Sequence, residues 1–463
     1  MTNWTPNTDD LEGPVYLAIA EQIAQAIRRG DLGAGVRLPT QRELALRLGL
    51  STQTVSQAYA EAERRGLVIG QIGRGTFVRF GQDEPEASFI MDRRSERVVD
   101  LSINRPIYDQ IHSDRVRSTL VDLGDRGDMS SMLVCRPIAG LDHHRQAGAL
   151  WLRRRGVEAP AEQIVICNGA AHALAVALAT MVRPGQTVAT EAIVDHGIIG
   201  LAGVLHFRLH GLPIDEEGIM PEALDTACSA GDIQVLCVTP CLSNPTVSLM
   251  SDERRRQIAA IARRRGIQIV ENDVYGYLVA DAPPPLWHYL PEQTHYVTSF
   301  TKITVSGLRV GYLASPARTI PRLRRSLRAT SWMATPLLAE IATRWILDGT
   351  AEELLLWQRR QLAIRHEILG EVLGDHAYTS HPNALHAWLP LPPAWRGEAF
   401  VSEARLKNVA VTPAEPFLVD RDAVPNAIRI SLGATRTTDE LREGLTILAD
   451  LLGQEPEPFY MPI

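Results

Sequence analysis

Lysine is nearly absent from this chain of 463 residues, because 45 of the 47 basic residues are arginine and only Lys302 and Lys407 are lysine. A deprotonated lysine amine can attack a carbonyl carbon and form a Schiff base, which a guanidinium cannot do. Lys407 lies in a charged stretch typical of a solvated helix end. Lys302 ends a predicted strand between Ser299 and Arg309, two residues that can bind a phosphate ester. Lys302 is therefore the predicted site of covalent chemistry.

Polar side chains follow two other predicted strands. Asn244 comes after strand 233–239 and before a proline, which favours an extended backbone that presents the amide at the strand's carboxyl end. A plain turn is the alternative there. Asp273 and Tyr275 follow strand 266–270 and, being two residues apart, project to one side. A carboxylate and a phenol in this arrangement can hold a heterocyclic nitrogen and a phenolate oxygen.

A predicted helix start supplies a further binding element. The chain runs from a strand through Gly169 into a helix that begins near Ala170 and Ala171. Backbone N–H groups at such a start can bind a phosphate, although a glycine that only permits close packing explains the pattern equally well. A phosphate site, an acid for a ring nitrogen, hydroxyl partners and a Schiff-base lysine, taken together in this order, indicate pyridoxal 5′-phosphate (PLP).

The elements that must position these residues change character along the chain. From Val98 onward, short β-branched runs alternate with long helices rich in Ala, Leu and Arg, which predicts an α/β domain with a mainly parallel sheet. Residues 81–97 are acidic and lack periodicity, so we interpret them as a linker. The predicted domains are therefore residues 13–80 and 98–455.

The first domain has the pattern of a winged helix-turn-helix. Helices are expected over Val15–Arg29, Gln41–Leu48 and Thr52–Arg65, followed by a hairpin of strands 67–71 and 76–80. Residues 28–79 carry nine Arg and four acidic residues, a net charge of +5, which predicts a local DNA-contacting patch. The expected DNA-binding residues are Arg37, Arg42, Thr52, Gln53, Thr54, Ser56 and Arg74. A small helical interaction domain is the alternative.

Composition argues against several other classes. The net charge of −7 and the pI of about 6.0 exclude a global polycation. No apolar run is long enough to span a bilayer, and residues 1–10 lack the pattern of a signal peptide, so we expect a cytoplasmic protein that does not contact membranes. The five cysteines are scattered, with neither a disulfide framework nor a metal-ligand spacing, and no metal site is predicted.

Three motifs in the first domain carry a family resemblance: Leu38-Pro-Thr-Gln-Arg-Glu-Leu44, Leu50-Ser-Thr-Gln-Thr-Val55 and Gly73-Arg-Gly-Thr-Phe77. Through them, residues 13–79 closely resemble the DNA-binding domain of the GntR family of bacterial regulators. Many relatives place Arg at the position of Thr52 or Gln53, so their operator sequences do not transfer to this chain.

Residues 98–452 resemble fold-type I aminotransferases, and the resemblance assigns a role to each residue singled out above. Lys302 would form the internal aldimine with PLP, and Asp273 would hold the pyridinium nitrogen. Tyr275 and Asn244 would bind the phenolate oxygen of the ring. The residues around the phosphate would be Ala170, Ala171, Ser299 and Arg309. Arg429, in Ala427-Ile-Arg-Ile-Ser431, would bind a substrate or effector carboxylate; a structural salt bridge is the alternative.

The chain departs from the aminotransferase pattern at three positions. Relatives have Glu-Ala-x-x-Tyr-Pro-Gly where this chain has Glu-Ala-Ile-Val-Asp195-His196-Gly, so the ring-stacking aromatic is missing and His196 is the candidate to stack instead. Cys135 stands where a phosphate-binding Tyr is usual. Asn272 competes with Asp273 in an ungapped comparison, and Asp273 is preferred because a neutral amide does not stabilise a pyridinium comparably.

A winged helix fused to an aminotransferase-like domain resembles the MocR subgroup of GntR regulators. This implies a PLP-dependent transcriptional regulator that forms an external aldimine with an amine or amino-acid effector. It also implies a head-to-tail, domain-swapped homodimer that binds paired half-sites in double-stranded DNA. Asp195-His196 is similar to regulators of ectoine catabolism, whose effectors are diaminobutyrate derivatives. Repression and activation remain open, and the alternatives are an active aminotransferase with a fused DNA-binding domain and a DNA-binding protein that has lost the cofactor.

Overall fold

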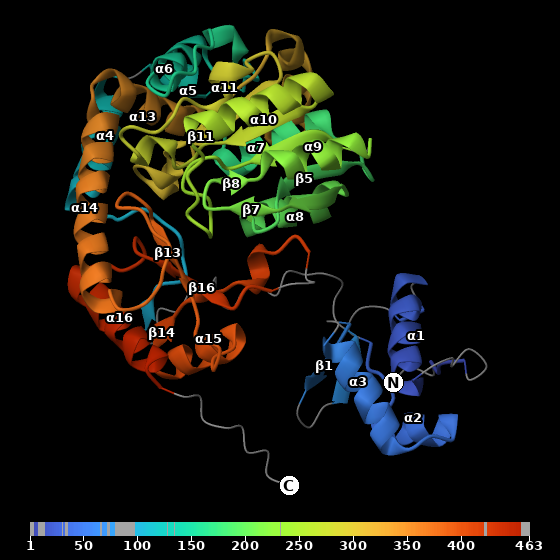
Figure 1. Cartoon of the computed structure of the whole chain (residues 1–463). Helices are drawn as coiled ribbons and strands as arrows, with labels where there is room; N and C mark the ends of the chain where they lie inside the picture. Colours follow the sequence, from blue (N-terminus) through green and yellow to red (C-terminus); the bar gives the residue numbers. More distant parts are fainter. Residues whose placement is uncertain are drawn as a thin grey trace. The chain divides into compact units, whose positions relative to one another are not determined.

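The computed structural model divides the chain into two compact units, Met1–Met91 and Asp92–Ile463 (Figure 1). The structure describes residues 4–7, 14–29, 31–32, 36–64, 67–71, 75–78, 98–126, 128–133, 135–231, 233–420 and 424–454. The predicted linker 81–97 and the predicted DNA-contacting residue Arg74 lie outside the described residues.

The first unit is a winged helix-turn-helix, as predicted. Its helices are α1 (Val15–Arg29), α2 (Gln41–Leu48) and α3 (Thr52–Arg64), and its strands are β1 (Val68–Gln71) and β2 (Gly75–Val78). The two strands pair antiparallel, with Gln71 opposite Gly75. Apolar side chains from all three helices, among them Ile23, Leu44 and Val55, form a buried core with residues of the hairpin.

Local capping explains why α2 and α3 begin and end where they do. The Thr40 hydroxyl accepts a hydrogen bond from the Glu43 N–H at 3.2 Å, which satisfies a free donor of the first turn. Gly49 ends α2 in the left-handed conformation (φ 66°), and the Ser51 hydroxyl then accepts from the Thr54 N–H at 3.1 Å. These short-range contacts fix the tight turn between the two helices.

The second unit contains a seven-stranded sheet in the order β4-β12-β11-β10-β9-β5-β6. The strands are β4 (Ile164–Cys167), β5 (Thr187–Glu191), β6 (Arg208–Leu212), β9 (Ile233–Val238), β10 (Gln268–Asn272), β11 (Thr294–Ser299) and β12 (Gly311–Ala314). Only β12 runs antiparallel to its neighbours within this sheet, so the prediction of a mainly parallel sheet is confirmed.

Helices cover both faces of this sheet, as Figure 1 shows for α7, α9 and α10. The helices of the unit are α4 (Gln110–Arg126), α5 (Met129–Met132), α6 (Asp142–Arg153), α7 (Ala170–Met181), α8 (His196–Leu205), α9 (Pro221–Ser229), α10 (Asp252–Arg265), α11 (Leu286–Tyr289), α12 (Ile320–Ser331), α13 (Pro336–Leu347), α14 (Thr350–Leu373), α15 (Gly397–Leu406) and α16 (Thr438–Leu452). In the part of the chain that the structure describes, no helix has the length and apolar character needed to cross a bilayer.

Successive side chains of β10 lie on opposite faces of the sheet. Val270 packs with residues of α7 and α12, and we call this side the α7 face. Ile269 packs with residues of α9, α10 and α11, and we call that side the α10 face. By the same alternation, Asn272 belongs to the α7 face and Glu271 to the α10 face.

A smaller C-terminal part completes the second unit. Its three-stranded sheet joins β13 (His386–Pro390), β16 (Ala427–Ser431) and β15 (Thr412–Pro413), and α14 and α16 lie along it (Figure 1). A second short ladder pairs β14 (Val409–Ala410) with β3 (Val99–Asp100), and a two-residue hairpin pairs β7 (Ile214–Asp215) with β8 (Gly218–Ile219). The pairing of β3 with β14 brings the start of the unit to its C-terminal part.

Candidate functional site

Lys302 lies in a short 3₁₀ turn, Phe300–Lys302, directly after β11. Its Nζ donates a hydrogen bond to the backbone oxygen of Asn104. Burial lowers the pKa of Lys302 to about 8; the nearby Asp195 opposes this shift, whereas Arg429 and Arg309 add to it. A larger minority of this amine is therefore neutral near physiological pH than for an ordinary lysine, and the neutral amine is the form that attacks an aldehyde.

The predicted phosphate ligands come together at the start of α7. Gly169 (φ 84°) precedes the helix, and a Cβ added there would lie 2.9 Å from Nη2 of Arg309. The Arg309 guanidinium therefore lies beside Gly169, the residue before the start of α7, and no ion pair joins it to another described residue. Ser299 is buried at the end of β11, on the α7 face. A cation, a helix N-terminus and a hydroxyl without a competing carboxylate fit a phosphate group.

The predicted phenolate and carboxylate ligands also meet. Nη1 of Arg429 donates to Oδ1 of Asn244 at 2.9 Å, and Nδ2 of Asn244 donates to Oδ2 of Asp195. Burial lowers the pKa of Arg429 to about 10, which leaves it a cation at neutral pH. Nε of Arg429 is buried and has no hydrogen-bond partner among the described residues. Tyr275 is also buried, and its hydroxyl accepts from Nδ2 of Asn104 at 3.1 Å.

Asp195 occupies the position of the missing aromatic residue, and its carboxylate is the N-cap of α8. It accepts from the Gly197 N–H at 2.9 Å. Although burial opposes ionisation, the neighbouring His196 and Lys302 lower the pKa of Asp195, so it faces Lys302 as an anion. The ring centroid of His196 lies 6.0 Å from that of Phe417.

Two residues that contact this group of side chains were not predicted from the sequence. Nδ2 of Asn104 lies 3.2 Å from Nδ1 of His386, and Nε2 of His386 lies 3.1 Å from the backbone oxygen of Ser243. Burial lowers the pKa of His386 to about 3, which keeps this imidazole neutral. Asn104 precedes α4 and His386 starts β13, so no local spacing links either residue to Lys302.

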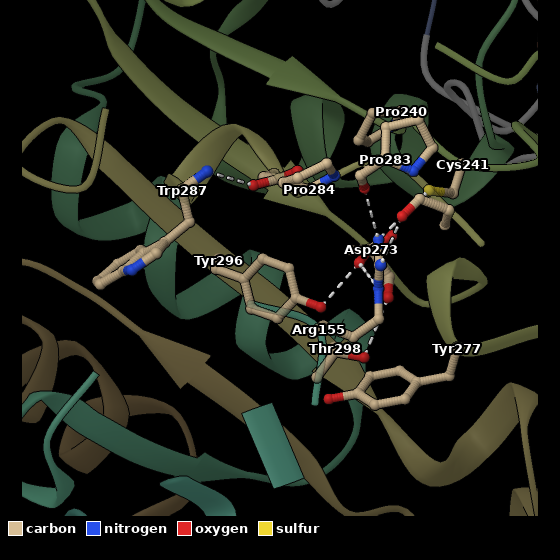
Figure 2. A network of polar contacts seen from close by, with 12 residues as sticks. Arg155, Pro240, Cys241, Asp273, Tyr277, Pro283, Pro284, Trp287, Tyr296 and Thr298 are labelled. Carbon is tan, nitrogen blue, oxygen red and sulfur yellow. Dashed lines mark hydrogen bonds and ion pairs between the residues drawn. The ribbon is translucent and has the colours of Figure 1, made fainter. Parts of the chain in front are cut away.

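The structure places Asp273 away from the other predicted cofactor residues. Asp273 is fully buried, and its Oδ2 pairs with Nε of Arg155 at 3.2 Å and accepts from the Tyr296 hydroxyl at 2.7 Å (Figure 2). Tyr296 stands opposite Glu271 in the sheet, on the α10 face. Complete burial opposes ionisation of Asp273, but Arg155 and Arg255 lower its pKa. The carboxylate is therefore a neutralised part of the core, on the opposite face from Ser299.

Asn272 is the last residue of β10 and lies on the α7 face, the same face as Ser299. It is 6% exposed, and its Nδ2 lies 3.4 Å from Oγ1 of Thr239. Its Oδ1 is buried and has no hydrogen-bond partner among the described residues. A buried amide with spare hydrogen-bonding capacity fits a heterocyclic nitrogen, and it is neutral. This geometry therefore favours Asn272, the residue that an ungapped comparison with the family selects, as the partner of the ring nitrogen.

A separate cavity of about 360 Å³ lies at the other end of the strands. Gln268, His295 and Arg322 are among its lining residues, and none of the predicted site residues lines it. We therefore place the candidate cofactor site at the carboxyl ends of the strands, where Lys302 lies.

The candidate DNA interface lies on α2, α3 and the hairpin. Thr52 and Gln53 are exposed, whereas Thr54 and Ser56 are half-buried, and the Thr54 hydroxyl lies 2.8 Å from that of Ser51. Arg42 is exposed in the first turn of α2. Arg37 packs against the hairpin, since a Cβ on Gly75 would lie 2.7 Å from its Nε. The exposed groups can reach DNA, and Arg37 also supports the hairpin.

Comparison with known proteins assigns both units. Residues 96–448 match the family described as aminotransferase class I and II, and residues 15–78 match the gntR family of bacterial regulatory proteins. The chain belongs to the aminotransferase class I and II family and carries a GntR helix-turn-helix domain ahead of it. This combination is that of the MocR subgroup, and the fold family of the second unit binds PLP.

Similarity to named transcriptional regulators extends over most of the chain. The HTH-type transcriptional regulator YdeF of Bacillus subtilis is 29% identical over 450 residues, 97% of each chain. The vitamin B6 salvage pathway transcriptional repressor PtsJ of Salmonella typhimurium is 27% identical and covers 84% of this chain and 88% of its own. These similarities favour a regulator over an active aminotransferase.

Solved aminotransferase structures share the fold of the second unit. The kynurenine aminotransferase of Pyrococcus horikoshii has a TM-score of 0.73 at 21% identity and covers 79% of this chain and 93% of its own. The α-aminoadipate aminotransferase LysN of Thermus thermophilus has a TM-score of 0.70 at 23% identity, with coverage of 77% and 92%. At these identities the likeness establishes the fold alone.

Proposed function

We propose that this protein is a transcriptional regulator that binds PLP at Lys302 and responds to a small primary amine by a change in DNA binding. One observation carries the proposal: Lys302, whose pKa is lowered to about 8, lies in an aminotransferase-like unit, and the same chain carries a winged helix. Lys302 is also one of only two lysines in the chain. Similarity to YdeF over 97% of both chains supports the same combination.

Different residues of this chain would bind different parts of the cofactor. Arg309, Ser299 and the N–H groups at the start of α7 would bind the phosphate. Asn244 and Tyr275 would bind the phenolate oxygen, and Asn272 would take the ring nitrogen in place of Asp273. When bound, PLP supplies an aldehyde that can exchange between the amine of Lys302 and the amine of a small molecule.

Arg429 makes an amino acid the best-supported effector class. It is a buried cation whose Nε has no hydrogen-bond partner among the described residues. Its Nη1 donates a hydrogen bond to Asn244. Arg429 can therefore bind the α-carboxylate of an amino acid while the amino group of the same molecule reaches Lys302. Asp195 adds an anion beside Lys302, and His196 flanks it. A carboxylate there can pair with a second ammonium group, which supports the diamino acids of ectoine catabolism as effectors and genes of that catabolism as targets.

Two features favour sensing over steady transamination. Asn272 is neutral, so it holds a proton on the cofactor ring less well than a carboxylate, and transamination depends on that protonated ring to withdraw electrons. Asp195 replaces the aromatic residue that would stack on the ring. Retention of Lys302 and Arg429 favours an aminotransferase as the second candidate.

We also propose that the protein works as a head-to-tail homodimer in the cytoplasm. Family resemblance supports this arrangement, and so does the exposure of Ala171 and Arg309, which a second chain can cover. Two winged helices would then bind paired half-sites of a DNA operator. Analytical ultracentrifugation of the PLP-bound protein should give the mass of a dimer; a monomer would contradict this arrangement.

The experiment for the proposed function compares two responses of the PLP-bound chain to amino acids. Binding to promoter DNA is followed by gel shift, and conversion of 2-oxo acids is followed under the same conditions. We expect an amino acid to change the DNA affinity of the wild-type chain but not of Lys302→Ala, with no steady turnover. Steady turnover at enzyme-like rates, without any change in DNA affinity, would favour the aminotransferase.

A further inference from the structure

A cluster of metal-ligating side chains lies outside the cofactor site, between α6 and α13. His143 and His144 are adjacent in the first turn of α6, and Glu340 lies on α13. Nε2 of His143 is 2.7 Å from Oε2 of Glu340, and Nε2 of His144 is 3.0 Å from the same oxygen. The sequence did not predict this site, because 196 positions separate His144 from Glu340.

The three ligand atoms already have the spacing of a metal site. They lie within 4.8 Å of one another. A tetrahedral zinc ion with bonds of about 2.0–2.1 Å separates its ligand atoms by about 3.3 Å. The two observed nitrogen–oxygen distances of 2.7 and 3.0 Å are slightly shorter, so small side-chain rotations make room for an ion. The donor set of two imidazoles and one carboxylate is that of catalytic and exchangeable zinc sites.

Burial differs among the three ligands in a way that suits a site with one open position. The side chain of His144 is 2% exposed and that of Glu340 is 11% exposed, whereas His143 is 49% exposed. The two inner ligands are thus held by packing between the helices, and solvent reaches the cluster beside His143. Water can therefore supply the fourth ligand.

The charges around Glu340 also suit a divalent cation. Nε of Arg344 binds Oε1 of Glu340 at 3.1 Å, so it orients the carboxylate and leaves Oε2 to the histidines. Arg344 also pairs with Asp122. Two carboxylates therefore share one guanidinium, and with neutral imidazoles the cluster has a net charge of −1.

We propose that His143, His144 and Glu340 bind a divalent transition-metal ion, with Zn²⁺ as the best fit, and that the ion ties the start of α6 to α13. Imidazole nitrogen with one carboxylate oxygen disfavours Mg²⁺ and Ca²⁺, which prefer oxygen ligands. The site is independent of the PLP residues, since none of them belongs to it.

The test is calorimetric titration of the full-length, PLP-bound, chelator-treated protein with Zn²⁺ alone, together with Co²⁺ absorption spectra. We expect one Zn²⁺ per chain, a raised unfolding temperature with Zn²⁺, and the visible bands of four-coordinate Co²⁺. His143→Ala changes a half-exposed side chain and should fold normally, and Glu340→Gln keeps the side-chain size. Each should weaken Zn²⁺ binding by at least about 100-fold.

Two matched variants separate this site from adventitious binding. His210→Ala removes an exposed histidine on β6, and Cys135→Ser removes the exposed thiol. Both should bind Zn²⁺ like the wild type. The proposal is overturned if the wild type shows no Zn²⁺ binding at several-fold molar excess. It is also overturned if His143→Ala and Glu340→Gln bind Zn²⁺ with unchanged affinity and stoichiometry, which would mean that the cluster is only hydrogen-bonded.

Discussion

Asn272 and Asp273 are neighbours at the end of β10, yet they lie in two different environments. On the α10 face, Asp273 is fully buried, and Arg155 and Tyr296 satisfy its Oδ2 (Figure 2). On the α7 face, Asn272 has an unsatisfied oxygen. The same side of the sheet holds Ser299, which precedes the partly exposed Lys302. Oδ1 of Asp273 also lacks a hydrogen-bond partner among the described residues, so an unsatisfied atom does not separate the two environments. What separates them is the side of the sheet and the buried guanidinium of Arg155, which pairs with Asp273.

This difference shows that charge alone does not identify a functional residue. A buried carboxylate that is paired with a buried guanidinium neutralises that cation within the fold, and removing one partner leaves an uncompensated charge. A buried amide with a free acceptor, or a lysine whose pKa burial lowers to about 8, keeps capacity for chemistry. Substitutions on the two faces should therefore affect different observables.

The largest effect is expected for Lys302→Ala on the α7 face. Without this amine, PLP can still be held by its phosphate and ring contacts, but the protein should show no imine absorbance band and no label that survives borohydride. The fold should be nearly unaffected, since Nζ makes one hydrogen bond, to Asn104, with a net worth of about 1 kcal/mol. Lys407→Ala is the matched control and should behave like the wild type. A Lys302→Ala protein that borohydride still labels with PLP would contradict the assignment.

Asp273→Ala should have the largest effect on stability. It leaves the guanidinium of Arg155 buried without its partner, which costs about 3–5 kcal/mol in the free energy of unfolding. Denaturant unfolding followed by circular dichroism measures this loss. Asn272→Ala, one residue away on the α7 face, should cost only about 1 kcal/mol and should weaken PLP binding instead. Equal stability losses in the two variants would remove the distinction between the faces.

Arg309→Ala should weaken PLP binding by about 1.5–3 kcal/mol, or roughly 10- to 150-fold, because it removes a charged partner of the phosphate. Fluorescence titration of the apo-protein with PLP gives this affinity. Arg318→Ala serves as the control, since Arg318 lines the cavity at the other end of the strands. An unchanged affinity in Arg309→Ala would exclude the start of α7 as the phosphate site.

The pH dependence of PLP attachment provides a smaller and finer test. Only the neutral amine attacks an aldehyde, and the pKa of Lys302 is about 8. The attachment rate should therefore rise with pH up to about 8 and level off above it, whereas an exposed lysine would still gain up to its ordinary pKa near 10.4. Asp195→Asn removes the carboxylate that raises the pKa of Lys302, so the rise should move to lower pH. Stopped-flow absorbance measures both profiles, and a shift to higher pH in Asp195→Asn would contradict this electrostatic role.

Local signals in the sequence were sufficient for much of the fold. The cap at Thr40 and the left-handed Gly49 determine the ends of α2, and both can be recognised within a few residues. The scarcity of lysine singled out Lys302 without any structural information. Contacts within one turn or one strand are encoded by neighbouring residues, so such features are predictable.

The side of the sheet on which Asp273 lies was not predictable in this way. Strand 266–270 was expected, but the ladder continues to Asn272, so the last residue on each face was misplaced. Arg155, the partner that neutralises Asp273, is 118 positions away. The clusters around Asn104 and around Glu340 also depend on residues that only the tertiary fold brings together.

The most direct test of the account is borohydride reduction of the PLP-bound protein followed by peptide mass mapping, with and without an amino-acid effector. We predict a single pyridoxyl label at Lys302 without effector, and with effector an unmodified Lys302 together with a reduced adduct of PLP and the amino acid. A label at Lys407, or no label at all, would contradict the account. So would a Lys302 label that no amine displaces.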